Sequence, residues 1–284
     1  MTVVLSKFKT HSTTQKNRLV AILLTVVLLS SLLIACALFM TNSNSPSSND
    51  GVIHVKNEKE LTNAINKAKK ATTITLDNDI TLTKPLTIPN KKEVTLTSNT
   101  TTTDSESFFK LIGAGNYQTA ITVSRGGVLY LAGITVTQSE TKGIGVNVTD
   151  GGKLYMTNGE ISGNHGWDPV DVWWSDYSYG GGVVVCSGGF FEMTGGTLVG
   201  NIGPHYGGGL AVFGVFIMSG NAVIANNSAV YGGCGVFVAV EGTFNMTGNA
   251  IDLFGNYKYC VELFCVKWFK LWLMVWLDTK KQQN

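Results

Sequence analysis

The chain has 284 residues, enough for one large domain or two small ones. Its 21 basic and 19 acidic residues leave a net charge of only +2, and only two of the cations are arginines, which argues against a nucleic-acid-binding protein. The five cysteines form no CxxC pair and no cluster with histidine, so we expect no zinc site and no other cofactor.

The N-terminal segment predicts a membrane association. Residues 1–18 are basic and contain no acid, and the following 22 residues, Leu19–Met40, carry no charge. A helix of that length spans a hydrocarbon core of about 30 Å. The basic flank is expected to stay in the cytoplasm, which places everything after residue 40 outside the cell. The Ser- and Asn-rich residues 41–51 then form a flexible linker.

Three fates of this segment compete. A retained signal-anchor is favoured, because the apolar run exceeds the usual core of a cleaved signal peptide. Leu33-Ile34-Ala35-Cys36 resembles the lipobox of bacterial lipoproteins, which would make Cys36 the lipidated residue, although apolar residues follow it in place of a polar tether. Cleavage after Ala37 is the third possibility. All three place the rest of the chain on the outer side of the membrane.

Residues 52–98 predict a helix followed by short strands. Glu58–Lys70 spaces Leu61, Ile65 and Ala68 on one face of a helix, with charges opposite. We expect this helix to cover the open end of the first coil of the repeats described next. Alternating apolar runs then predict strands at 73–76, 80–82, 86–88 and 94–96, and the polar residues 99–107 predict a loop.

From Ala120 to Phe254, a unit of about 25 residues is repeated five times. Each copy has two pairs of apolar residues at alternate positions, followed by one lone apolar residue. The first pairs are Ile121/Val123, Val146/Val148, Val183/Val185, Leu210/Val212 and Val236/Val238. The second pairs are Leu129/Leu131, Leu154/Met156, Phe191/Met193, Phe216/Met218 and Phe244/Met246, and the lone positions are Val136, Ile161, Leu198, Val223 and Ile251. A period of two within a period of about 25 predicts three short strands in each coil of a solenoid.

Asparagine recurs at one place in three of these coils. Asn164, Asn201 and Asn226 each lie eight residues after the second member of the second apolar pair, and Phe254 occupies the place in the last coil. Because asparagine tolerates a left-handed backbone and stacked amides can bond to each other, we expect a ladder of these side chains from coil to coil. Cys186 and Cys234, in or beside first strands, are expected to be small buried apolar residues rather than a disulfide.

The recurring Tyr-Gly-Gly-Gly, Phe-x-Met-Thr/Ser-Gly and Gly-x-Leu/Ile-x-Gly-Asn motifs resemble right-handed parallel β-helix surface proteins. These are the adhesin-like repeat proteins of bacteria and methanogenic archaea, which belong to the broad pectate-lyase-like fold. The resemblance covers residues 52 to about 256 and implies an all-β fold, a right-handed parallel β-helix. It implies little about function, because one fold hosts lyases, hydrolases and adhesins.

The charges argue against an enzyme acting on acidic polysaccharides. Lys153 is the only cation between Gly143 and Ala250, whereas a lyase needs a base and a binding site for an acidic polymer. A hydrolase would need paired carboxylates. Glu160, Glu192 and Glu241 are scattered, and three aspartates cluster only in one insertion. A solvated acidic loop is the simpler interpretation, and we predict no catalytic residue.

That insertion follows Asn164, where fourteen residues replace the usual four before the next tyrosine. It holds three of the six tryptophans, and its candidate ligand-binding residues are Trp167, Asp168, Asp171, Trp173, Trp174, Asp176 and Tyr177. Exposed aromatic rings beside carboxylates can stack on sugars and bind their hydroxyl groups. Alternatively, the rings fold back over the adjacent coils, because buried aromatic area would pin a long loop. Calcium held by the three aspartates is a weaker possibility, and no metal site is predicted.

Residues 257–284 depart from the repeat. Trp268, Trp272 and Trp276 recur every four positions, on one side of a predicted helix, and Lys267 and Lys270 interrupt the apolar run. An aberrant or truncated end is slightly favoured over a cap on the last coil, and a membrane-surface helix is the third possibility.

Together these patterns predict a cytoplasmic segment (1–18), a transmembrane or signal segment (19–40), a linker (41–51), a parallel β-helix (52–256) and a C-terminal tail (257–284). We expect a non-enzymatic, adhesin-like protein held at the cell surface by residues 19–40, with a glycan or a surface receptor as partner and no nucleic acid. The alternatives are a polysaccharide-active hydrolase or lyase, and a structural envelope protein without a specific ligand.

Overall fold

The computed structural model describes residues 52–69, 71–99, 108–139, 142–166 and 179–247, and the backbone of 263–265. The chain divides into two compact units, 1–49 and 50–284, and the first lies wholly outside the described residues. The predicted segments at 1–18, 19–40 and 41–51, including Cys36, therefore also lie outside them. Among the helices of the described part, none is long and apolar enough to cross a membrane.

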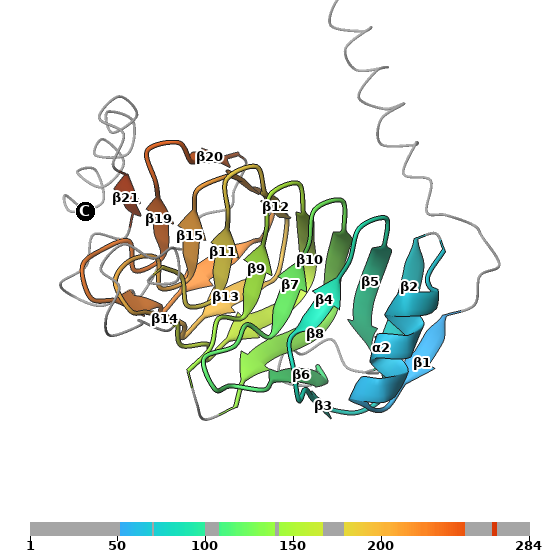
Figure 1. Ribbon diagram of the computed structural model, residues 1–284. Helices are drawn as coiled ribbons and strands as arrows, with labels where there is room; N and C mark the ends of the chain where they lie inside the picture. Colours follow the sequence, from blue (N-terminus) through green and yellow to red (C-terminus); the bar gives the residue numbers. More distant parts are fainter. Residues whose placement is uncertain are drawn as a thin grey trace, which may run out of the picture. The chain divides into compact units, whose positions relative to one another are not determined.

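The described strands lie side by side in parallel sheets, stacked as in a β-solenoid (Figure 1). The first sheet has twelve strands. Eight of them follow one path: β1 (Ile53–Val55), β2 (Thr72–Leu76), β5 (Glu93–Ser98), β8 (Val128–Gln138), β10 (Lys153–Ser162), β12 (Phe190–Met193), β16 (Val215–Met218) and β20 (Thr243–Met246). The other four pair beside this path: β3 (Ile80–Thr81), β6 (Lys110–Gly113), β13 (Thr197–Val199) and β17 (Val223–Ala225).

The second sheet has seven strands: β4 (Leu86–Ile88), β7 (Ile121–Val123), β9 (Val146–Val148), β11 (Val183–Val185), β15 (Leu210–Val212), β19 (Val236–Val238) and β21 (Leu263–Cys265). A third sheet joins β14 (Ile202–Gly203) and β18 (Ser228–Ala229). Consecutive strands of one sheet come from consecutive repeats, so each sequence repeat is one coil. The strands predicted between residues 73 and 96 are present as β2, β3, β4 and β5.

The predicted inward positions form the core. Val146 pairs with Val183 in the second sheet, and Leu154 pairs with Phe191 in the first, so equivalent residues of successive coils stack on each other. The same stacking places the rings of Phe191, Phe216 and Phe244 in one column, with centroids 5.0 Å apart at each step. Like-on-like stacking explains why the interior of the repeat varies little, since each side chain packs against its own kind.

The asparagine ladder is present, but its third member is Asn227 rather than Asn226. Asn164, Asn201 and Asn227 are fully buried. Asn226 has a φ of 53°, and the glycines before the other two ladder residues, Gly163 and Gly200, both have a φ of 64°. The residue with the left-handed backbone therefore directly precedes the ladder asparagine in each coil, whereas the sequence analysis had assigned both roles to one residue.

The shift arises one turn earlier in the same coil. Leu198 pairs with Ile224, which is fully buried, whereas the predicted lone apolar residue Val223 is only half-buried. The turn after Met218 is one residue longer than the turn after Met193, and Gly220 within it adopts a φ of 63°. The extra residue is absorbed in the turn, so the strands stay in register and every later position moves by one.

Helix α2 (Glu58–Lys67) packs at the end of the solenoid that begins with β1 (Figure 1). Its buried residues are Leu61, Ala64 and Ile65, which join the core, so the predicted cover of the first coil is confirmed. The side chain of Asn57 caps its first turn by accepting from the Glu60 N–H. The helix ends at Lys67, earlier than predicted, because Ala68 is extended and the Lys92 ammonium bonds the last carbonyls, those of Asn66 and Ala68.

The two cysteines differ from expectation. Cys186 is half-buried, and its Sγ lies 3.3 Å from Asn147 Oδ1. Cys234 is fully buried as predicted, but it is disulfide-bonded, so the expectation of a simple buried apolar residue was wrong for it. A buried cysteine packs as a small apolar side chain whether or not it is disulfide-bonded. The packing pattern in the sequence therefore could not distinguish these two states of Cys234.

Candidate functional site

The seven predicted ligand-binding residues, from Trp167 to Tyr177, lie outside the described residues. The structure does describe both ends of this insertion. The Gly166 N–H donates to the Ile202 carbonyl at 2.8 Å, and the Gly180 N–H donates to the Tyr206 carbonyl at 2.9 Å. Both ends are thus fixed to the same neighbouring segment, residues 202–206.

A cluster of six rings lies at this point of the solenoid. We call it the loop-base cluster, and its members are Tyr179, His205, Tyr206, Phe213, Tyr231 and Phe237. Tyr179 stacks on Tyr206 with a centroid distance of 5.7 Å and on Phe237 at 5.4 Å, and it meets Phe213 edge-on at 5.1 Å. Tyr179 is also the residue with which the insertion ends, so the insertion runs directly into the cluster.

The repeat itself builds this cluster. Tyr179 and Tyr206 begin the Tyr-Gly-Gly-Gly motif in two successive coils, and a parallel bridge joins their backbones. Their rings cover the outward side of the second sheet, where Ala211 and Phe237 are buried although they do not face the core. The sequence prediction treated this tyrosine as part of a fold motif only, and its recurrence beside the insertion was the signal that it missed.

One ring of the cluster and two apolar side chains near it in the sequence are exposed. Tyr231 is 61% exposed, Val230 is 68% exposed and Ile202 is 40% exposed. His165, just before the insertion, is half-buried, and burial together with the nearby Lys142 ammonium lowers its pKa below the usual value. The exposed side chains of Tyr231, Val230 and Ile202 give this part of the surface an apolar character.

A second aromatic surface lies on the outward side of the first sheet. Tyr130 and Tyr155 occupy one column and stack with centroids 4.8 Å apart and an interplanar angle of 13°. Glu93 accepts a hydrogen bond from the Tyr130 hydroxyl at 3.3 Å, and Glu192 follows Tyr155 in the same column. Burial, followed by the charge of Glu93, raises the pKa of Tyr130 to about 12, and burial followed by Glu192 raises the pKa of Tyr155. Because these two rings stack on each other, they offer edges and hydroxyls rather than open ring faces.

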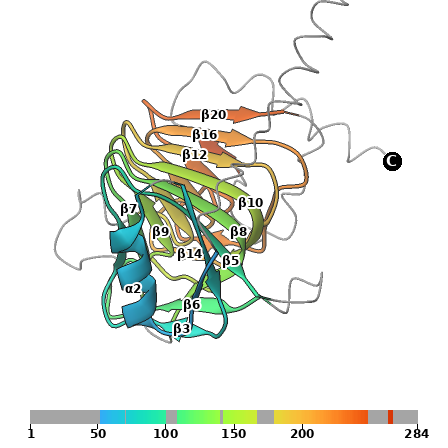
Figure 2. The ribbon, with the colours of Figure 1, turned by 90° about the vertical axis from the view of Figure 1, so that its right-hand side faces the viewer.

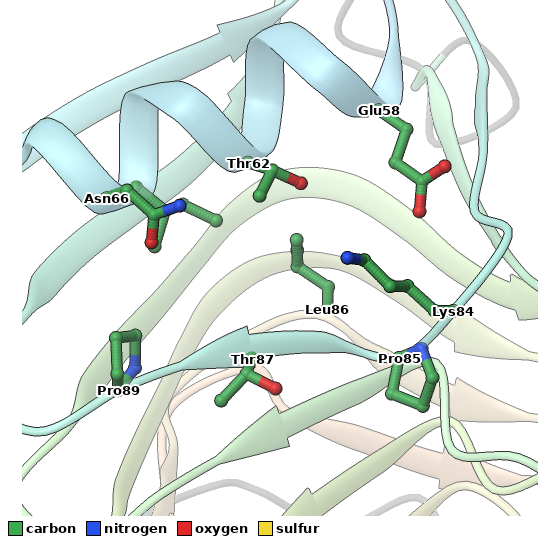
Figure 3. A pocket seen from close by; sticks show the side chains of 9 residues that line it. Glu58, Thr62, Asn66, Lys84, Pro85, Leu86, Thr87 and Pro89 are labelled. Atoms are coloured by element: carbon green, nitrogen blue, oxygen red, sulfur yellow. The ribbon is translucent and has the colours of Figure 1, made fainter.

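A groove of about 310 Å³ separates α2 from β4 (Figure 3). Glu58, Thr62 and Asn66 line it from the helix, and the opposite side is lined by Lys84, Pro85, Leu86, Thr87 and Pro89. Because Leu86 and Ile88 bond to β7, the backbone of Thr87 between them points away from β7, which makes this side of β4 the free edge of the second sheet. The Glu58 carboxylate is occupied by the Thr83 N–H and hydroxyl. Prolines beside a covering helix are common protection for a strand edge, and we interpret the groove in this way.

The described ranges show no group of side chains arranged for acid–base catalysis or for metal binding. Glu160 pairs with Thr197, away from the column of Glu192, so these two carboxylates do not share one face position. In the part of the chain that the structure describes, no three His, Cys, Asp or Glu side chains could hold a metal ion together.

Comparisons with known proteins identify no relative. No family model matches the chain, and neither a curated protein nor a solved structure matches it significantly.

Proposed function

We propose that this protein is a non-enzymatic, adhesin-like rod that is held at the outer surface of the membrane by residues 19–40 and binds a glycan beside the insertion at 167–178. The rod is a right-handed parallel β-helix in this proposal. The observation that carries the proposal is the loop-base cluster, because six rings, including the exposed ring of Tyr231, gather where the longest insertion into the repeats leaves the solenoid.

The chemistry of this surface favours a sugar. Sugar rings present apolar C–H faces that pack on aromatic rings, and their hydroxyls need nearby acceptors. Tyr231 supplies an exposed ring, and the neighbouring insertion adds three tryptophans and three aspartates. Loops that project from a rigid scaffold are a common place for such recognition.

The charges favour a neutral glycan. From Gly143 to Ala250 the sequence has one cation, Lys153, and the insertion itself carries only acids. An acidic polysaccharide would be repelled by the aspartates without a compensating ammonium or guanidinium group. We therefore expect neutral sugars to bind and uronic acids or sulfated sugars not to bind.

A glycan-binding screen on the full chain, run beside an assay for released reducing sugar, tests this proposal. We expect binding of a neutral glycan that falls at least tenfold in a Trp173→Ala/Trp174→Ala variant and in Tyr231→Ala. Tyr155→Ala is the matched control, because it removes an outward tyrosine from the other sheet and should leave binding unchanged.

Other outcomes would contradict the proposal. Sugar release that disappears in Asp171→Asn would establish an enzyme, and binding that depends on Tyr155 but not on Tyr231 would place the site on the first sheet. Neither binding nor release would favour a structural envelope protein. Mass spectrometry of the N-terminal peptide separates a lipid on Cys36 from a retained or a cleaved segment.

A further inference from the structure

The end of the first sheet opposite α2 leaves core residues half-exposed. β20 is the last strand along the path of this sheet, far from α2 in both views (Figures 1 and 2). Phe244 and Met246 occupy the columns of Phe216 and Met218. Phe216 and Met218 are 0% and 1% exposed, whereas Phe244 and Met246 are only half-buried. Each of these inward side chains therefore has a neighbouring coil on one side only.

The backbone of β20 shows the same asymmetry. Thr243 and Thr247 donate their N–H groups to carbonyls of the preceding coil. In a parallel strand alternate residues point in opposite directions, so the N–H groups of Phe244 and Met246 point away from that coil. An uncovered edge of this kind pairs readily with another chain, and solenoids require a cap at each end.

The chain does return to the solenoid after residue 256. β21 pairs in parallel with β19, with Val236 opposite Leu263, so this strand lies beyond the predicted end of the repeats. In five coils, the first-sheet strand starts seven residues after the second-sheet strand, as from Val236 to Thr243. The same spacing would start a further first-sheet strand at Lys270, beside β20.

A close contact blocks that continuation. The residue just before the first-sheet strand is a glycine in four of those five coils: Gly127, Gly152, Gly189 and Gly242. In the first of the five coils it is Lys92, and there the second-sheet strand β4 is the edge of its sheet and has no preceding coil beside it. A Cβ atom at the glycine positions would lie 2.3 to 2.8 Å from a carbonyl oxygen of the preceding coil, which is too close for any side chain. Phe269 occupies the corresponding place in the tail. The sequence of the tail therefore does not fit this turn, which argues against a sixth coil of the same shape beside β20.

We propose that residues 266–284 leave the path of the coils and pack across the last coil as its cap, with Trp268, Trp272 and Trp276 over Phe244 and Met246. These 19 residues follow β21 directly and form a segment of about 28 Å if helical. The tryptophans share one side of such a helix, and each can bury about 150–250 Å². α2 performs the same task at the other end with Leu61 and Ile65.

Hydrogen exchange of the full chain in detergent micelles tests this cap. The variant Trp268→Ser/Trp272→Ser/Trp276→Ser should exchange the amides of Phe244 and Met246 at least tenfold faster, and the amides of Val183–Val185 at the unchanged rate. Lys280→Ser/Lys281→Ser is the matched control, because it changes the same tail without removing apolar area, and it should leave all these rates unchanged.

Several results would overturn the proposal. Unchanged exchange at Phe244 and Met246 in the triple variant would show that the tail does not cover them. Protection that is lost on dilution would assign the edge to a second copy, and protection that requires lipid vesicles would assign the tail to a bilayer. If the triple variant also loses protection at Val183–Val185, the milder Trp272→Ser is measured with the same criteria. None of these outcomes depends on glycan binding, so the two proposals fail separately.

Discussion

The asparagine ladder offers a quantitative test of how the coils are held together. Asn201 is its central member and is fully buried. Its Oδ1 accepts from the N–H of Asn164 at 3.1 Å and from Asn164 Nδ2 at 2.9 Å. Its own Nδ2 donates to the Ile161 carbonyl at 2.8 Å and to Asn227 Oδ1 at 3.0 Å. Asn201→Ala removes these four bonds and keeps the two backbone bonds, from its N–H to Asn227 Oδ1 and from the Ser228 N–H to its carbonyl.

The expected cost follows from what each partner loses. The buried N–H of Asn164 has no other acceptor among the described residues, and an orphaned donor costs about 1–3 kcal/mol. The other three bonds each contribute about 1 kcal/mol. We therefore expect Asn201→Ala to lower the free energy of unfolding by about 4–6 kcal/mol.

Asn164→Ala provides the internal comparison. Asn164 Oδ1 is buried and finds no donor in the described part of the chain, so this substitution removes an unsatisfied acceptor together with the bonds of Nδ2. No backbone donor is orphaned, and we expect a smaller loss of about 2 kcal/mol. Asn245→Ala, at an exposed outward position of β20, should change stability by less than about 0.5 kcal/mol.

Urea denaturation of residues 50–284, which form one compact unit, measures these differences when followed by circular dichroism. Hydrogen exchange at Asn164 reports the same loss locally if the coils do not unfold together. An Asn164→Ala variant that is as destabilised as Asn201→Ala, or more so, would refute the reasoning, because the difference rests on the orphaned N–H group.

Three further predictions concern single positions. Gly152→Ala should lower the free energy of unfolding by several kcal/mol, because the new Cβ would lie 2.4 Å from a carbonyl oxygen. Gly200→Ala has open space around its Cβ and should cost only about 1–2 kcal/mol, for its positive φ. Equal losses of the two variants in thermal unfolding would contradict this. The phenol of Tyr130 should titrate near pH 12, and Glu93→Gln should lower that pKa in an ultraviolet absorbance titration, whereas an unchanged value would exclude the charge of Glu93 as a cause. His165 has a folded-state pKa below its unfolded value of about 6.5, so its contribution to stability is present above that pH and is lost as the pH falls. His165→Gln should therefore flatten the decrease of the melting temperature at acidic pH. An unchanged dependence of the melting temperature on pH would refute this.

Much of the fold could be predicted because apolar side chains recur at the same positions in each repeat. The alternation of Val183 and Val185 and the spacing to Phe191 specify a strand, a turn and a second strand without any knowledge of long-range contacts. Local chemistry also predicted α2, since the spacing of its apolar face is a local feature. The candidate site was less predictable, because the insertion gave a location, whereas the rings that surround its base come from three different coils.

What the sequence by itself determined is the coil: its length, its strands and the residues that face inward. Only the tertiary structure decided which residues of neighbouring coils meet. It placed Asn227 rather than Asn226 in the ladder, gathered Tyr179, Tyr206 and Phe237 into one cluster, and returned the chain to the second sheet at β21. The physical reason is that hydrogen bonds between coils fix the register of the strands, while turns of variable length absorb insertions. Spacing along the chain therefore specifies each coil but not the alignment between coils.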